Sequence, residues 1–206
     1  MKVGIIGLPQ TGKKTLFQIL TGKEITEPSK ALKPVPGTAD ILDSRFNHLV
    51  EMYAPKKNVR ARIDLVLLPK MEAETISAGD IFKDIADMDA ICHVVRAFED
   101  EAVYHAQGSV DAFRDFEMVN SELIMHDQIF AEKRIERLEA MVKKIKDETH
   151  QKELDLMNRL KQVLETEQPL RLTHLSEEEE KMIRSYPFIT RKKLLIAVNV
   201  SEADLG

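Results

Sequence analysis

Two glycines and a lysine near the start of the chain have the spacing of a phosphate-binding loop. In the segment Gly7-Leu-Pro-Gln-Thr-Gly-Lys13, four residues separate the glycines and the lysine follows the second glycine directly. Glycine lets the backbone wrap close to phosphate oxygens, and amides that point inward bind the anion together with the lysine ammonium. The segment follows an apolar run, Val3 to Ile6, and precedes a predicted helix, which makes the motif specific. It predicts a site for a nucleoside triphosphate or diphosphate.

The residue after the loop lysine departs from the motif. Lys14 stands where such loops carry Ser or Thr, whose hydroxyl binds Mg²⁺. Thr15 cannot simply replace it, because one step along a helix turns the side chain by about 100°. The loop residues that we expect at the nucleotide are Leu8, Pro9, Gln10, Thr11, Gly12, Lys13, Lys14 and Thr15.

Alternating apolar and helical segments predict the layers that position this loop. Buried strands are expected at residues 3–6, 61–68, 90–98 and 194–199, with helices at 13–20 and 45–53. Residues 23–44 and 69–79 are expected to form loops; the first of these segments holds three prolines and a glycine and lacks a period. Strand, helix and strand in alternation are typical of an α/β fold, and the continuous apolar strands indicate a mostly parallel sheet flanked by helices.

A different pattern occupies residues 111–174. Two long helices are expected there, at about 111–146 and from about 150 to 167, each with a narrow apolar stripe among charges. The stripes consist of Leu138, Met141, Val142 and Ile145, and of Leu154, Met157, Leu160, Val163 and Leu164. They predict an antiparallel coiled-coil hairpin inserted into a nucleotide-binding domain of residues 1–110 and 175–206. Two ordinary core helices are the alternative. Ser176 and Glu179 have capping-box spacing and predict a further helix that ends before Pro187.

Composition limits the other possibilities. The formal net charge is −5, so an RNA contact needs a local basic cluster, and specific DNA binding is not expected. Such clusters occur at Lys56, Lys57, Arg60 and Arg62 and at residues 191–193, where a solvated surface is the simpler explanation and an RNA-phosphate contact the alternative. The histidines are dispersed without metal-ligand spacing, so no metal site is predicted. No apolar stretch approaches the ~20 residues that span a membrane, and with the single cysteine, Cys92, this favours a cytoplasmic protein.

The sequence, the loop included, resembles the YchF or Obg-like ATPases, within the Obg branch of translation-factor GTPases. The resemblance rests on the segments Gly4–Phe17, Asp89–Asp100, Gly108–Asp111, Asn120–Leu123, Leu175–Arg184 and Asn199–Glu202. It implies a G domain interrupted by a coiled coil, a purine nucleotide ligand (ATP, in some cases GTP), slow hydrolysis and association with ribosomes. The family also has closing elements of the G domain and a TGS domain, which this sequence lacks. It is therefore expected to be a fragment or a truncated relative.

The resemblance also shows where the hydrolytic positions differ. The switch I threonine of the family falls at Ala31, and its Asp-x-x-Gly motif falls at Leu67-Leu-Pro-Lys70. Asp64 lies three residues back, roughly 10 Å away at strand rise, and is a poor substitute. We therefore expect weak or lost hydrolysis and a site that depends little on Mg²⁺. The alternatives are a slow NTPase that recruits metal in another way, and a scaffold that no longer binds nucleotide.

The final segment bears on base recognition. Asn199-Val200-Ser201-Glu202 stands where GTPases have Asn-Lys-x-Asp, whose Asp accepts two hydrogen bonds from guanine. Here the lysine is absent and the carboxylate is one methylene longer, so guanine is not demanded. The resemblance implies that adenine is tolerated or preferred, with Asn199, Val200 and Glu202 at the base.

Overall fold

The computed structural model describes residues 1–25, 33–72, 75–76, 79–105, 107–144 and 147–204. The elements follow one another in this order: β1 (Lys2–Ile6), α1 (Lys13–Thr21), β2 (Val35–Asp40), α2 (Ser44–Tyr53), β3 (Arg62–Leu67), α4 (Asp80–Ala86), β4 (Ala90–Arg96), α5 (Ala112–Lys144), α6 (Glu148–Glu165), η1 (Leu170–Leu172), α7 (Glu177–Ile183), β5 (Lys193–Asn199) and η2 (Glu202–Asp204). No helix among the described residues is long and apolar enough to cross a membrane.

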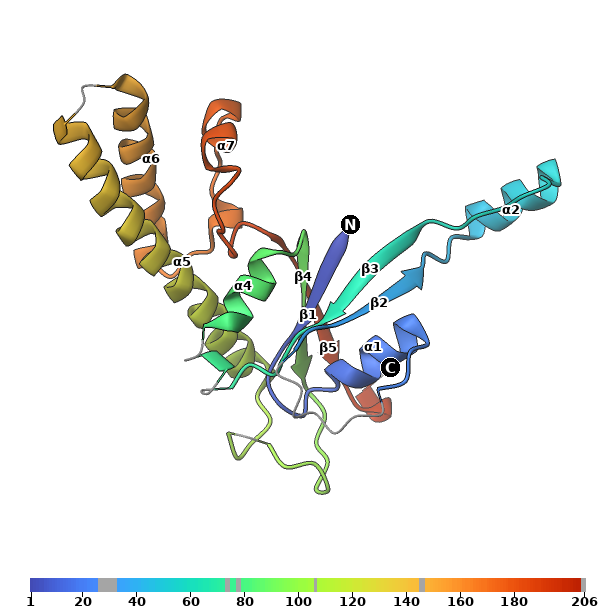
Figure 1. The fold of residues 1–206 in the computed structure, drawn as a ribbon. Coiled ribbons are helices and arrows are strands. Elements are labelled where there is room, and N and C mark those ends of the chain that lie inside the picture. Colours follow the sequence, from blue (N-terminus) through green and yellow to red (C-terminus); the bar gives the residue numbers. More distant parts are fainter. Residues whose placement is uncertain (26–32, 73–74, 77–78, 106, 145–146, 205–206) are drawn as a thin grey trace.

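The strands form one sheet in the order β2-β3-β1-β4-β5. All neighbours are parallel except β2 and β3, which run antiparallel (Figure 1). Strand β2 lies inside the segment that was predicted to be a loop, so that prediction was wrong. Its sequence, Val-Pro-Gly-Thr-Ala-Asp, has no apolar run, but an edge strand tolerates proline and β3 supplies its hydrogen bonds.

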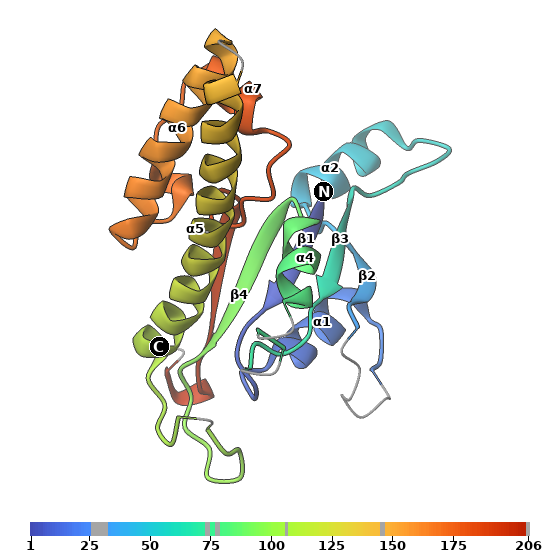
Figure 2. The same ribbon diagram turned by 60° about the vertical axis from the view of Figure 1, so that its left-hand side comes forward.

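Helices cover both faces of the sheet, which confirms the predicted α/β fold (Figure 2). On one face, Phe17 of α1 packs against Ile5 and Leu67. A Cβ on Gly37 would lie 2.6 Å from Cζ of Phe17, so glycine in β2 lets α1 approach the sheet. On the other face, α4 and the first part of α5 pack over the sheet, and Val119 and Leu123 belong to this core. Helix α4 was not predicted.

The remainder of α5 forms a helical hairpin with α6. Leu138, Met157 and Leu160 are fully buried between the two helices, as the stripes predicted. Met141 is 40% exposed, and Ile145 lies outside the described residues. The capping box of Ser176 and Glu179 opens α7 as predicted.

The hairpin is not a free-standing pair of helices, because α7 and the segment that follows pack against it. Ile183 and Phe188 belong to the same apolar cluster as the hairpin residues. The first turns of α5, in contrast, pack with the main sheet. Helix α5 thus contributes to two apolar clusters, and the domain boundaries expected at residues 111 and 175 remain a prediction.

A buried carboxylate joins the hairpin to the sheet. Asp127 of α5 is 0% exposed and accepts hydrogen bonds from the amides of Ile189 (2.9 Å) and Thr190 (2.7 Å) and from Oγ1 of Thr190 (2.7 Å). A buried charge must be satisfied in this way. The contact fixes the chain immediately before it enters β5, the strand that ends beside the phosphate loop.

Candidate phosphate-binding site

The loop between β1 and α1 has the backbone of an anion-binding turn. Gly7, Gln10 and Gly12 all have positive φ angles, of 147°, 62° and 90°. A Cβ on Gly7 would lie 2.4 Å from the carbonyl oxygen of Val94, and one on Gly12 would lie 2.4 Å from Nδ2 of Asn199. Both positions therefore require glycine. Left-handed residues within such a turn direct successive amides to one side, at the positive end of α1.

Lys13 lies inside this turn. Its side chain is buried, and Nζ donates hydrogen bonds to the carbonyl oxygens of Gly7 (2.7 Å) and Leu8 (2.5 Å). Burial, above all, and the charges of Lys70 and Lys14 together lower the pKa of Lys13 to about 7, against the opposing charge of Glu72. An anion beside this ammonium would favour its charged form. The buried lysine and the open amides thus fit a phosphate group.

The end of β5 is attached to the loop. Nδ2 of Asn199 donates a hydrogen bond to the carbonyl oxygen of Thr11 (3.1 Å), and Thr11 is itself buried, with Oγ1 donating to Leu8 (3.1 Å). Two predicted parts of the site, 188 residues apart in the sequence, are therefore in contact.

The other predicted residues differ in exposure. Leu8 is buried, Pro9, Gly12, Lys14 and Val200 are half-buried, and Gln10, Thr15 and Glu202 are exposed. Glu202 lies on the short helix η2 that follows β5.

The residues present do not fit a magnesium ion. Leu67 is buried in β3, paired in register with Ile5, and Asp64 is in register with Lys2 at the opposite end of β1. Ala31 lies outside the described residues. Since Mg²⁺ requires a near-octahedral shell of oxygens, Lys14 and Leu67 cannot supply its protein ligands.

One residue at the carboxyl end of a strand was missed by the sequence interpretation. Arg96 ends β4 in register with Asn199 and is 1% exposed; its Nε donates to the carbonyl of Phe98 (3.0 Å). The guanidinium lies 4.5 Å from the ring centroid of Phe98, and Nη1 has no hydrogen-bond partner among the described residues. A charged residue that closes an apolar strand is the signal that could have identified Arg96.

His93 also lies near the loop, in the middle of β4. Its ring is buried and stacks on Phe116, with 5.7 Å between the ring centroids. Burial and the nearby charge of Lys13 lower the pKa of His93 to about 4. It is therefore neutral at physiological pH and serves as a buried core residue.

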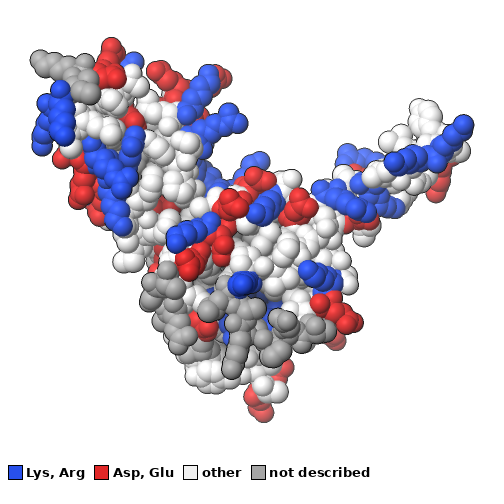
Figure 3. Space-filling model, viewed as in Figure 1, with Lys and Arg blue, Asp and Glu red and all other residues white. Residues whose placement is uncertain are grey.

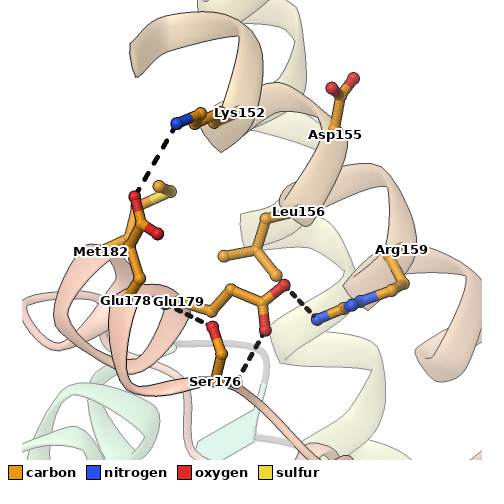
Figure 4. A pocket seen from close by; sticks show the side chains of 8 residues that line it. All are labelled: Lys152, Asp155, Leu156, Arg159, Ser176, Glu178, Glu179 and Met182. Atoms are coloured by element: carbon orange, nitrogen blue, oxygen red, sulfur yellow. Dashed lines mark hydrogen bonds and ion pairs between the residues drawn. The ribbon is translucent and has the colours of Figure 1, made fainter.

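A separate pocket of about 270 Å³ lies between α6 and α7, far along the chain from the loop (Figure 4). Four of its five charged side chains form pairs, Arg159 with Glu179 at 2.7 Å and Lys152 with Glu178 at 3.9 Å, and the fifth, Asp155, accepts a hydrogen bond from Gln151. These pairs join the two helices. The residues of this pocket therefore serve the packing of α7 against α6. The phosphate loop remains the stronger candidate for a ligand-binding site.

The fold and the loop define the chain as a P-loop domain of the G-domain class. No protein-family model matches it. It is 35% identical over 213 residues to "Ribosome-binding ATPase YchF" of Bacillus subtilis, which covers 100% of this chain and 58% of that protein. It is 34% identical over 211 residues to "Obg-like ATPase 1" of Caenorhabditis elegans, covering 99% of this chain and 53% of that protein.

A solved structure agrees with these relatives. The YchF GTPase of Schizosaccharomyces pombe matches with a TM-score of 0.77 and 29% identity, covering 99% of this chain and 57% of that chain. Over its whole length, the chain is thus a homologue of the YchF and Obg-like ATPases. It spans about half the length of the relatives that it matches.

Proposed function

We propose that this chain binds a purine nucleotide, with its phosphates on residues 8–15 and its base beside Asn199, Val200 and Glu202. The observation that carries the proposal is the buried ammonium of Lys13 inside a glycine turn that Asn199 holds from β5. A lysine whose pKa is lowered by burial gains from an anionic partner. The names of the relatives, ATPase in two cases and GTPase in one, support a nucleotide ligand.

Hydrolysis is proposed to be weak or lost. In a P-loop enzyme, Mg²⁺ bridges the β- and γ-phosphates and neutralises charge in the transition state. Here Lys14 replaces the hydroxyl ligand and Leu67 replaces the carboxylate. A fixed ammonium at Lys14 stabilises bound phosphates but cannot coordinate oxygens and water as the ion does, and it repels the ion. With the Lys14 ammonium in place of the hydroxyl ligand of Mg²⁺, we expect nucleotide binding to depend little on Mg²⁺.

Calorimetric titration with ATP, GTP, ADP and GDP, together with a phosphate-release assay, tests the proposal. Saturable binding of at least one nucleotide without measurable turnover is expected. Binding with robust Mg²⁺-dependent turnover would favour the slow NTPase. A folded protein that binds none of the four would favour a scaffold that uses its helical hairpin for protein contacts.

We further propose that the extension around α2 contacts RNA phosphates, as the name of the B. subtilis relative, ribosome-binding, suggests. Lys and Arg side chains gather on this extension (Figure 3), and α2 has no buried residue. Lys56, Lys57 and Arg62 are exposed there. Binding of the chain to purified ribosomes should weaken with rising salt and after Lys56→Glu with Lys57→Glu. Unchanged binding by this double variant would contradict the assignment.

A further inference from the structure

The chain that leaves β3 runs directly beside the phosphate loop. β1 and β3 are parallel, with Ile5 opposite Leu67, and their carboxyl ends share one edge of the sheet. The amide of Leu68 donates to the carbonyl of Ile5 (3.1 Å), and the amide of Met71 donates to the carbonyl of Gly7 (3.3 Å). Lys70 therefore adjoins the first glycine of the loop, where ligands of such sheets bind.

The turn that carries Lys70 is anchored. Thr75 is 6% exposed, and its Oγ1 lies 2.6 Å from the carbonyl oxygen of Lys70 and 2.9 Å from that of Glu72. The amide of Glu72 donates to the same hydroxyl at 3.1 Å. These contacts hold the backbone at Lys70, and with it the Cα from which the side chain extends.

Lys70 brings its charge close to Lys13. After burial, the charge of Lys70 is the largest cause that lowers the pKa of Lys13, ahead of that of Lys14. Coulomb interactions weaken with distance and with exposure to solvent. The charge of Lys70 therefore acts on Lys13 under more favourable conditions than the charge of Lys14 does. Of the two additional lysines at this site, Lys70 rather than Lys14 thus has the stronger influence on the loop ammonium.

Among the described residues, this concentration of positive charge is offset in part by Glu72 and forms no ion pair. Within the part of the chain that the structure describes, no carboxylate forms an ion pair with Lys13, Lys14 or Lys70. Glu72 is near enough to raise the pKa of Lys13 but forms no such pair. Like charges held together destabilise one another unless an anion joins them.

We propose that Lys70 binds the terminal phosphate of a nucleoside triphosphate and makes the site prefer triphosphates to diphosphates without a metal ion. This inference rests on the proposed function and adds to it a residue and a selectivity. The loop amides and Lys13 bind the phosphates that a diphosphate and a triphosphate share. Lys70, at the end of the neighbouring strand β3, contacts only the γ-phosphate of the triphosphate. Glu72 opposes the same phosphate by its negative charge.

The test compares ATP with ADP in the presence of a metal chelator, using the full chain and calorimetry. The unmodified protein is expected to bind ATP more tightly. Lys70→Met should weaken ATP binding about tenfold or more while changing ADP binding less than about threefold. Glu72→Gln should strengthen ATP binding, in the opposite direction. Lys181→Met removes the same charge from an exposed site on α7 and should change neither affinity.

Lys70→Gln and a thermal melt of each variant separate binding from folding, since a purely structural role would affect ATP and ADP alike. Equal loss of both ligands in folded Lys70 variants, or unchanged affinity for both, would overturn this inference and leave the proposed function intact. An unmodified protein that binds neither ATP nor ADP would overturn the proposed function and this inference with it.

Discussion

The two sides of the candidate site differ in how far they keep the residue types of a P-loop enzyme. On the loop side, Gly7, Gly12 and Lys13 retain the backbone and the buried ammonium of a phosphate cradle, and Asn199 ties the cradle to β5. On the opposite side, toward β3, the resemblance places the Asp and the Gly of the family's Asp-x-x-Gly motif at Leu67 and Lys70. Under the proposed function, holding phosphate and assisting its transfer are separable tasks, because amides and a lysine perform the first and a coordinated ion performs the second.

The largest expected effect concerns the loop side. Lys13→Met removes the buried ammonium that a phosphate would meet, and charge-assisted hydrogen bonds of this kind contribute about 1.5–3 kcal/mol each. ATP and ADP should therefore both bind roughly 100-fold more weakly, as measured by calorimetry. The exposed Lys181→Met variant serves as the control. Retained affinity after loss of Lys13 would place the phosphates elsewhere.

The pH dependence of binding should follow the same lysine. The pKa of Lys13 is about 7 in the free site, and a bound phosphate raises it. Between this value and the higher value of the complex, binding must take up a proton. The dissociation constant for ATP should therefore rise with pH above 7, by up to about tenfold per pH unit. Lys13→Arg, which stays charged, should remove this slope; an equal slope in that variant would implicate another group.

A smaller effect is expected from the contact that holds the loop. Asn199→Ala removes the hydrogen bond to the carbonyl of Thr11, which contributes about 1 kcal/mol. Nucleotides should bind about fivefold more weakly, and the melting temperature should fall by a few degrees. Asn158→Ala, on the exposed surface of α6, is the matched control. An affinity unaffected by Asn199→Ala would mean that β5 does not position the loop.

The smallest expected difference is between the two bases. Asn199-Val200-Ser201-Glu202 lacks the lysine and the aspartate with which GTPases read guanine, and Glu202 is exposed. ATP should bind at least as tightly as GTP in side-by-side titrations. A tenfold preference for GTP, about 1.4 kcal/mol, would show that Glu202 or another group reads guanine after all.

Sequence reasoning succeeded where the information was local. The glycine spacing of the loop, the apolar runs of the parallel strands and the capping box of Ser176 are each contained in a few neighbouring residues. The fold class followed from their alternation.

It failed where a partner distant in the sequence decides the structure. Val35–Asp40 becomes a strand only because β3 lies beside it. Asp127 looks like one more surface charge on a long helix, yet it is buried against Thr190, 63 residues away. Likewise, nothing in the local sequence shows that Lys70 acts on Lys13. The division of α5 between two cores is equally invisible to its periodicity.

The most direct test of the contrast between the two sides is the affinity for ATP measured with Mg²⁺ and with a chelator, in the unmodified protein and in Lys14→Ser. For the unmodified protein, the two dissociation constants should agree within about threefold, and no phosphate should be released. Lys14→Ser restores a hydroxyl ligand and should make binding sensitive to Mg²⁺ without turnover, because Leu67 and Lys70 remain. Two results would contradict the proposed loss of Mg²⁺ binding and of Mg²⁺-assisted hydrolysis. One is that the unmodified protein binds ATP tenfold more tightly with Mg²⁺, and the other is robust Mg²⁺-dependent release of phosphate.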